Sequence, residues 1–533
     1  MLKPLFRIAI FLFLVWGCAP STNNQHQNEV FRYNEHRNIS SLDPAFARNP
    51  QNIWPVNQLF NGLVQLDDSL RIQGDIARKW TISDDGIRYD FYLKKEVYFH
   101  PSPYFKDTTR IVVAQDFVYS FDRLKDPKVA SPGGWVLQQV SSYKALNDSV
   151  FSIELKQPFS SFLGVLSMKY CAVVPHEVVD GLGNDFGKKP IGTGPFLFKT
   201  WKENLKLVLR KNNRYFEKDA SGKSLPYLEA VAITFLEDKQ SEFMAFVQGN
   251  IDFLNSLDPS YKDELLTTEG KLQPRYENRF RLLIGPYLNT EYIGLFVDKN
   301  ASKFASKKLR QAINMAIDRK QMVKYLRNNI GYAAHNGFVP KGLQGSTPIK
   351  GNDYRPLEAK KILKEYLKKS DTNTVSIQLA TDANYLDLCK FIQQSLQKVG
   401  LEVSINVMPV ASLRQAKSSG KLEMFRASWI ADYPDAENYF SLFYSKNFSP
   451  NGPNYTHFKN EAFDQLYEQS LKEKSFEKRQ VLFNKMDEII VEEAPVIPLY
   501  YDKVVRFTQN NVTGLGNNPI NILHLKRVKK ISL

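Results

Sequence analysis

Apolar and polar residues alternate in short runs through the early part of the chain. The segment IRYDFYLKKEVYFH (87–100) predicts a pair of strands, and VFSIELKQPF (150–159) predicts a strand that enters a proline turn. The segments KLVLRKN (206–212) and LEAVAITFLE (228–237) continue the pattern. A period of two residues is typical of half-buried strands, so this region is expected to be rich in β-structure.

The spacing of apolar residues changes after residue 300. In SKKLRQAINMAIDRKQMVKYL (306–326) the apolar residues fall near one stripe, with lysine and arginine opposite, and this pattern predicts one amphipathic helix. The stripe consists of Leu309, Ala312, Ile313, Ala316, Ile317 and Met322.

The next three segments predict a strand, a helix and a second strand with short connections. They are VSIQLA (375–380), DLCKFIQQSLQKVG (387–400) and the alternating LEVSINVMPV (401–410). The helix would end at Gly400, a favoured residue after a helix terminus. Such a βαβ unit implies a parallel strand pair with a right-handed crossover, so the carboxy-terminal third is predicted to be an α/β domain. The predicted helix buries Cys389, Ile392, Leu396 and Val399.

An acidic and aromatic stretch, WIADYPDAENYF (429–440), continues from the strand-like MFRASWI (424–430). It therefore lies at the carboxyl end of a strand, where open α/β sheets tend to bind ligands. No lysine or arginine falls between Arg426 and Lys446. The stretch is compatible with a metal site, a catalytic carboxylate pair, a binding site for a cationic ligand, or an ordinary solvated turn. Its carboxylates are Asp432, Asp435 and Glu437.

Length and composition predict a multidomain globular protein. The chain has 533 residues, 43% of them hydrophobic, and a formal net charge of +15 from 71 basic and 56 acidic residues. This length favours two to four domains and the hydrophobic content excludes bulk disorder. The densest basic run, HLKRVKKISL (524–533), is interpreted as solvated charge in preference to a surface for anionic lipid or nucleic acid.

The amino terminus has the pattern of an export signal. Lys3 and Arg7 precede the apolar run IAIFLFLV (8–15), which is too short to span a bilayer. Cys18 follows Gly17 and resembles the lipidated cysteine of a bacterial lipobox, although Trp16 is bulkier than that pattern prefers. A plain secretory signal is the alternative. The predicted division is a lipoprotein signal peptide at 1–18 and a tether at 19–29, which would reach about 18 Å as a flexible linker.

Enzyme motifs are absent from the sequence. HEVVD (176–180) lacks the second histidine of a zinc-protease helix, and GLGNDFG (181–187) has neither phosphate-loop nor dinucleotide spacing. The seven histidines show no pair at ligand spacing, so neither a metal nor a cofactor is expected. Cys171 and Cys389 lie in unlike contexts and are predicted to be buried thiols without a disulfide. Catalysis, including an extracytoplasmic hydrolase activity, is unsupported.

Six segments, in this order along the chain, resemble the peptide- and nickel-binding family of extracellular solute-binding lipoproteins, solute-binding family 5. Proteins of this family serve ATP-driven importers for oligopeptides and dipeptides. The resemblance spans nearly the whole mature chain. The segments are SLDPAF (41–46), GDIARKWTISDDGIRYDFYL (74–93), PIGTGPFLFKTW (190–201), KLRQAINMAIDRKQMV (308–323), DYPD (432–435) and APVIPLYYD (494–502).

The resemblance implies an α/β fold: a two-lobed clamp of the periplasmic-binding-protein type II kind, with an extra α+β domain inserted in the first lobe. One departure is PSPYFKDTTRIVVAQDFVYSF (101–121), which is longer than the family pattern within the extra domain. Two long connections between lobes suit hinge bending. The implied boundaries are 30–62, 188–282 and 506–533 for lobe I, 63–187 for the extra domain and 283–505 for lobe II.

The resemblance also implies a site for an extended peptide. Asp432 would pair with the free α-ammonium, and Ser428 and Ile430 would offer backbone groups to the ligand as to an added strand. Trp429 would line a side-chain pocket and Arg426 would meet a ligand carboxylate. A solvated turn remains the alternative for Asp432, and a core position for Trp429. Asp435 and Glu437 are interpreted as turn and helix-start residues.

The function implied is that of a monomeric, lipid-anchored binding protein on the periplasmic side of a bacterial membrane. It would capture oligopeptides and deliver them to an ABC permease. The alternative is the same fold with another solute, such as a metal chelate, a haem-like compound or an oligosaccharide. A nucleic-acid partner conflicts with the export signal.

Overall fold

The computed structural model describes residues 29–531 except 257, 259, 299–301, 344–348, 352 and 371. The predicted signal peptide with Cys18, and the tether up to residue 28, lie outside the described residues. Among the described residues, no helix combines the length and the apolar character that crossing a bilayer would require.

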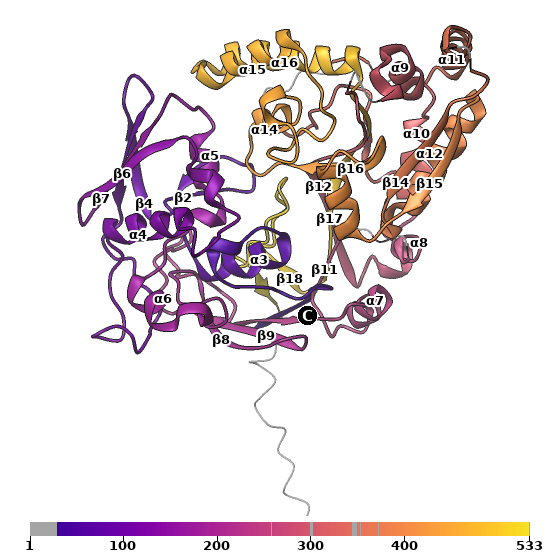
Figure 1. Ribbon diagram of the computed structural model, residues 1–533. Coiled ribbons are helices and arrows are strands. Elements are labelled where there is room, and N and C mark those ends of the chain that lie inside the picture. Colours follow the sequence, from indigo (N-terminus) through magenta and orange to yellow (C-terminus); the bar gives the residue numbers. More distant parts are fainter. Residues whose placement is uncertain are drawn as a thin grey trace, which may run out of the picture.

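A single mixed sheet runs through the molecule (Figure 1). Its strands follow the order β15-β14-β16-β12-β17-β11-β1-β10-β9-β8, and β13 pairs with β17. Their bounds are β1 (Val30–Asn34), β8 (Phe196–Lys202), β9 (Lys206–Lys211), β10 (Ala230–Thr234), β11 (Phe253–Asn255), β12 (Phe280–Leu295), β13 (Tyr332–Ala333), β14 (Ser376–Thr381), β15 (Glu402–Val407), β16 (Met424–Ile430) and β17 (Val496–Gln509).

The helices cover both halves of this sheet. Figure 1 shows α4 and α5 on one side of the molecule and α12 on the other, with β12 and β17 between them. The helix bounds are α3 (Pro50–Leu59), α4 (Ala114–Lys125), α5 (Phe162–Leu166), α6 (His176–Leu182), α7 (Lys239–Val247), α8 (Lys262–Leu265), α9 (Lys307–Met315), α10 (Arg319–Arg327), α11 (Pro356–Ser370), α12 (Leu386–Val399), α13 (Val410–Ser418), α14 (Glu437–Phe440), α15 (Glu461–Lys472) and α16 (Phe476–Glu493).

β12 and β17 are long antiparallel strands that connect the two halves. The first part of β12 (280–286) pairs with residues 503–509, and its second part (290–294) pairs with residues 496–501, with register shifts between the two parts. Beyond them, β16 borders β12 on one side and β11 borders β17 on the other. The predicted lobe boundaries fall inside these two strands, and the division into lobes stays a prediction.

Two large apolar cores flank this connection. One is built mainly from residues 31–253 and 512–528, and the other from residues 288–500. A separate antiparallel sheet, in the order β4-β5-β7-β6, packs into the first core together with α4. The segment predicted as an extra domain therefore shares its core with the first lobe. The remaining strands are β2 (Val64–Leu66), β3 (Ile72–Gly74), β4 (Ala77–Ile82), β5 (Arg88–Leu93), β6 (Val140–Asn147), β7 (Val150–Leu155), β18 (Val512–Thr513) and β19 (Lys529–Lys530).

The strand pair predicted at 87–100 is wrong in part. Only β5 forms there, and its two edges are taken by β4 and β7. Because both edges of β5 are occupied, the following residues cannot fold back onto it. Tyr98 instead makes an isolated bridge with Ile111, in the segment that departs from the family pattern.

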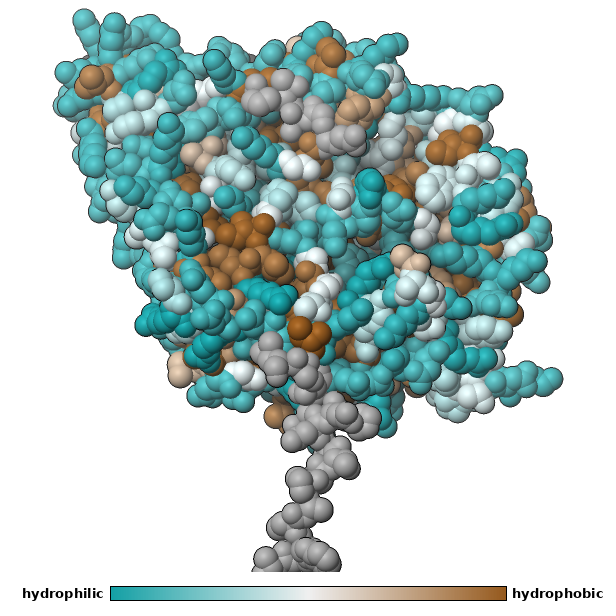
Figure 2. Space-filling view, turned by 180° about the vertical axis from the view of Figure 1, so that it is seen from behind, coloured by the Kyte–Doolittle hydropathy of each residue, from teal (hydrophilic) through white to brown (hydrophobic). Residues whose placement is uncertain are grey.

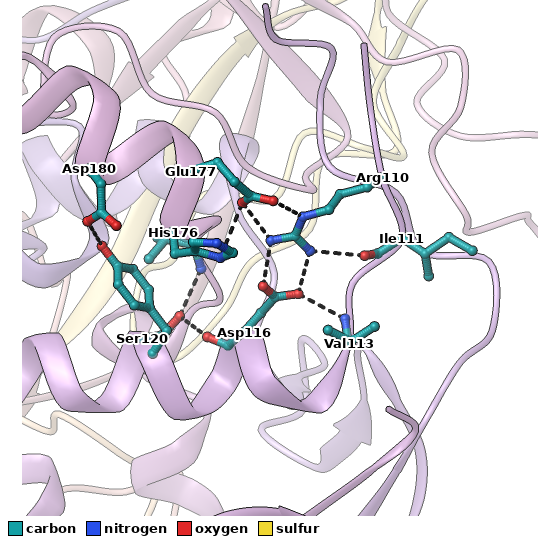
Figure 3. A network of polar contacts seen from close by, with 10 residues as sticks. Arg110, Ile111, Val113, Asp116, Ser120, His176, Glu177 and Asp180 are labelled. Carbon is teal, nitrogen blue, oxygen red and sulfur yellow. Dashed lines mark hydrogen bonds and ion pairs between the residues drawn. The ribbon is translucent and has the colours of Figure 1, made fainter. Parts of the chain in front are cut away.

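Arg110 holds that departing segment in place. Its guanidinium bonds to Asp116 at 2.7 Å and to Glu177 at 2.5 Å, and so joins α4 to α6. Figure 3 shows Arg110 between these two carboxylates. These ion pairs therefore attach the longer loop to α4 and α6.

The amphipathic helix predicted over 306–326 is two helices, α9 and α10. The break falls where Asp318 adopts an extended backbone and its side chain accepts the N–H of Gln321 at 3.0 Å, which caps α10. The apolar stripe continues across the break because both helices pack on the same core. Arg319 then becomes fully buried and donates to the carbonyl oxygen of Pro498 at 2.6 Å.

The βαβ unit is confirmed. β14 and β15 pair in parallel, α12 connects them, and Gly400 has a left-handed φ of 104° at the helix end. β16 lies on the other side of β14 and is also parallel to it. Cys389 and Cys171 are both buried free thiols, as predicted.

The carboxy-terminal basic run is only partly solvated, which corrects the prediction. The side chain of Lys530 is only 5% exposed and pairs with the buried Asp252 at 2.8 Å, and Lys526 pairs with Glu217 at 2.8 Å. Arg527 and Lys529 are exposed. The run thus anchors the end of the chain on the first half. The face seen in Figure 2 is mostly hydrophilic, with hydrophobic residues gathered in a few patches.

Candidate functional site

β16 has an open edge in the part that precedes the acidic stretch. It pairs with β12 from Met424 to Ile430, but β14 pairs with it only at Met424 and Phe425. Residues 426–430 therefore have a strand neighbour on one side. The other side is available to an extended chain, as at the edges of other sheets.

The hydrogen-bond pattern shows which residues face this edge. Ala431 N–H donates to the Leu288 carbonyl at 2.9 Å, and Phe296 N–H donates to the Glu423 carbonyl at 2.8 Å, so odd-numbered residues of β16 direct their backbone groups toward β12. Because these directions alternate along an antiparallel strand, Ser428 and Ile430 direct theirs away from β12. In the described part of the chain, no backbone bond to another segment occupies them.

Asp432 follows the open edge directly. Its side chain is accessible to solvent, yet dense protein surroundings raise its pKa to about 6, and a hydrogen bond from Asn438 opposes the shift. The Asn438 side chain also accepts the Trp429 indole N–H at 2.9 Å and the Asp432 backbone N–H at 3.2 Å. Among the residues that the structure describes, Asp432 has no basic partner within ion-pair distance. Asp432 is therefore a carboxylate without a counter-charge among the described residues, in surroundings that exclude part of the solvent.

The two other carboxylates of the stretch are structural, as predicted. Asp435 accepts the backbone N–H of Glu437 at 2.9 Å and pairs with Arg479 at 2.9 Å. Glu437 is buried at the start of α14 and accepts hydrogen bonds from the hydroxyls of Tyr433 and Tyr467. Within the described residues, no group of histidines, cysteines and carboxylates is arranged to hold a metal ion.

Arg426 is engaged within the protein. Its guanidinium forms a two-point ion pair with Glu291, with one contact at 2.7 Å, and lies 3.1 Å from the ring centroid of Tyr385. Glu291 is 1% exposed; burial raises its pKa, and the charge of Arg426 opposes that shift. The contact of Arg426 with a ligand carboxylate stays a prediction. Trp429 is half-buried beside the second core, so it has both a core face and an accessible face.

The loop after β16 touches the other half of the molecule. Tyr433 packs in the first apolar core, with its ring centroid 6.5 Å from that of Trp135. Arg479, which pairs with Asp435, also donates to the Ser161 hydroxyl at 3.3 Å, next to α5. Asp432 therefore lies beside a contact between the two halves.

A group of basic residues around Tyr455 was not identified from the sequence. Lys417 on α13 lies with its ammonium 4.2 Å from the ring centroid of Tyr455. The charges of Arg48 and Arg414 lower the pKa of Tyr455 against the larger effect of burial. These residues come from three distant segments, so no local sequence pattern marks them.

Known proteins match most of the chain. A sequence profile of the bacterial extracellular solute-binding proteins, family 5 Middle, matches residues 71–451. The glutathione-binding protein GsiB of Escherichia coli (strain K12) is 26% identical over 490 residues, which cover 90% of this chain and 91% of that protein.

Solved structures agree. The periplasmic binding protein DppA from Helicobacter pylori in complex with peptide STSA has a TM-score of 0.80 at 25% identity, covering 95% of this chain and 99% of that one. The dipeptide binding protein from Pseudoalteromonas sp. SM9913 in complex with Met-Leu has a TM-score of 0.79 at 22% identity, covering 94% and 100%. The predicted fold class, a two-lobed α/β periplasmic-binding-protein clamp with an extra antiparallel sheet, is confirmed.

Proposed function

We propose a function on one premise: the chain belongs to the bacterial extracellular solute-binding proteins of family 5. It is a substrate-binding component of an ABC importer, and its family is not enzymatic. Its ligand is an oligopeptide, held in extended form between the two halves and delivered to the permease.

The observation that carries this proposal is the open edge of β16 with an uncompensated carboxylate at its end. Ser428 and Ile430 would pair with the main chain of a peptide, which gives affinity without reading side chains. Asp432 would receive the α-ammonium in a charge-assisted hydrogen bond worth about 1.5–3 kcal/mol. Relatives support the ligand class, since one carries a tetrapeptide and another a dipeptide in its solved structure.

Native mass spectrometry of the protein, purified without a denaturing step, tests the ligand class. We expect adducts of several masses that fragment into peptides, because main-chain pairing tolerates many sequences. A single discrete mass of another chemical kind would instead favour the alternative solutes: a metal chelate, a haem-like compound or an oligosaccharide. Denatured protein from the same preparation, which should carry no adduct, is the control.

The lipid anchor is a second part of the proposal. Cys18 would carry the lipid and hold the body on the periplasmic side of a membrane, with residues 19–29 as the tether. We expect Cys18→Ser to move the protein from the membrane fraction to the soluble fraction after cell fractionation. Cys171→Ser is the matched control, because that thiol is buried in the first core and should leave fractionation unchanged. Unchanged membrane retention of Cys18→Ser would contradict lipidation.

A further inference from the structure

In the second half of the molecule, a lysine on α13 has no acidic partner among the described residues. In the described part of the chain, Lys417 has neither an ion pair nor a hydrogen bond, and its ammonium lies against the faces of Tyr455 and Phe425, at 4.2 and 6.0 Å from the ring centroids. Burial, helped by the charges of Arg426 and Arg414, lowers its pKa to about 8. Keeping this cation next to other cations opposes folding, so a compensating anion from outside the chain would stabilise the arrangement.

The charges of two arginines act on the same tyrosine, Tyr455. Arg414 precedes Lys417 by three residues on α13, and this spacing places both on one face of the helix. Arg48 comes from the other half of the molecule, just before α3. Both arginine side chains are exposed, and within the described residues neither has an ion pair. Because both act on the Tyr455 hydroxyl, they lie within electrostatic reach of it.

The charges of Arg48 and Asp432 both act on Tyr170. Burial raises the pKa of Tyr170 to about 12, while the charge of Arg48 lowers it and that of Asp432 raises it. Tyr170 therefore lies within reach of both charges, one from each half. Arg426 is not a further free cation for the ligand, because it is paired with Glu291. Among the described residues, one carboxylate (Asp432) and three cations (Arg48, Arg414 and Lys417) of this region therefore have no ion pair.

We infer that Arg48, Arg414 and Lys417 form an anion subsite, and that the ligand is an acidic peptide with more carboxylates than ammonium groups. The inference rests on the proposed function and names its substrate class. The ammonium of the ligand would go to Asp432, and its terminal and side-chain carboxylates would go to the three cations. A neutral dipeptide or a sugar would leave at least two of the cations unpaired.

Isothermal titration calorimetry with two tripeptides tests the inference. The probes are Ala-Glu-Gly and its neutral counterpart Ala-Gln-Gly, titrated into full-length protein in mild detergent after removal of bound ligand. We expect the acidic peptide to bind about tenfold tighter, the effect of one charge-assisted contact. Equal affinities for the two peptides would overturn the inference and leave the proposed function intact. If neither peptide binds, the proposed function itself fails.

Variants assign the preference to residues. Arg48→Gln and Lys417→Met should each reduce the ratio of the two affinities by about fivefold or more, whereas Lys417→Arg should keep it. Lys398→Gln, which removes an exposed charge at the end of α12, is the matched control and should leave the ratio unchanged. A ratio that survives in Arg48→Gln/Lys417→Met would overturn the assignment. Thermal melts followed by circular dichroism confirm that each variant is folded.

Discussion

Asp432→Asn is expected to weaken binding of a free-amine peptide by about 30- to 1,000-fold, or about 2–4 kcal/mol, the usual loss when one partner of a desolvated charge pair is removed. The same peptide with an acetylated amino terminus should bind both proteins with similar affinity. The reason is that, among the described residues, Asp432 has no basic partner within ion-pair distance, so the ammonium would be its main partner. Calorimetric titration of the four combinations measures the coupling.

The pH dependence of binding gives an independent test of the same residue. Affinity should be nearly constant between about pH 6.5 and 7.5, below the pKa values near 8 of the peptide α-ammonium and of Lys417. Because the pKa of Asp432 is about 6 in the ligand-free protein, affinity should fall by up to about tenfold per pH unit as the pH drops below 6. Asp432→Asn should remove this dependence. Equal losses of affinity for the free and the acetylated peptide would contradict the ammonium contact.

The stability of the Asp432→Asn variant separates a binding role from a structural one. The folded-state pKa of Asp432 lies above its ordinary value, so its protonated form favours folding, and that contribution is lost as the pH rises through about 6. At neutral pH the ionised carboxylate therefore opposes folding. We expect the ligand-free variant to be at least as stable as the parent and to have lost peptide affinity. A solvated turn acid would not lose affinity on substitution, and a structural carboxylate would lose stability.

Local patterns in the sequence determine the parts of the fold that were predicted correctly. The alternation in 401–410, the helical stripe around Cys389 and the glycine at 400 are each sufficient for their element, and β14, α12 and β15 form where expected. The errors arise where distant segments decide. Arg319, just after the helix break, is buried against the distant carbonyl of Pro498, and the missing strand after β5 depends on β4 and β7 already occupying its edges.

The candidate site shows the same limit. The position of Asp432 after a strand was visible in the sequence, and so was the absence of nearby basic residues along the chain. Basic residues that are absent from the neighbouring sequence are nevertheless close in the folded protein, because Arg479 reaches Asp435 from 44 positions away. Glu291 reaches Arg426 across 135 positions, and the charges of Arg48 and Asp432, which lie far apart in the sequence, both act on Tyr170. A sequence pattern carries no information on such pairs, and the role that the family resemblance implies for Arg426 did not include its internal partner.

Arg426→Met is expected to lower the free energy of unfolding by about 3–5 kcal/mol, because it leaves the carboxylate of Glu291 buried without a counter-charge. The methionine would keep an apolar contact with Tyr385, so the loss of stability would measure the removal of the guanidinium charge. Glu291→Met/Arg426→Met removes both charges and should recover most of the stability, since buried ion pairs are often replaced by apolar residues at little cost. Urea unfolding of the three proteins measures this cycle.

The same cycle decides between the two roles of Arg426. If the arginine serves mainly the ligand, Arg426→Met should lose peptide affinity at nearly unchanged stability, and the double variant should bind no better. If it serves mainly Glu291, the double variant should be stable and should still bind acidic peptides through the three cations of the anion subsite. The contacts favour the second result, because both ends of the Arg426 fork are already held by Glu291 and its face is covered by Tyr385.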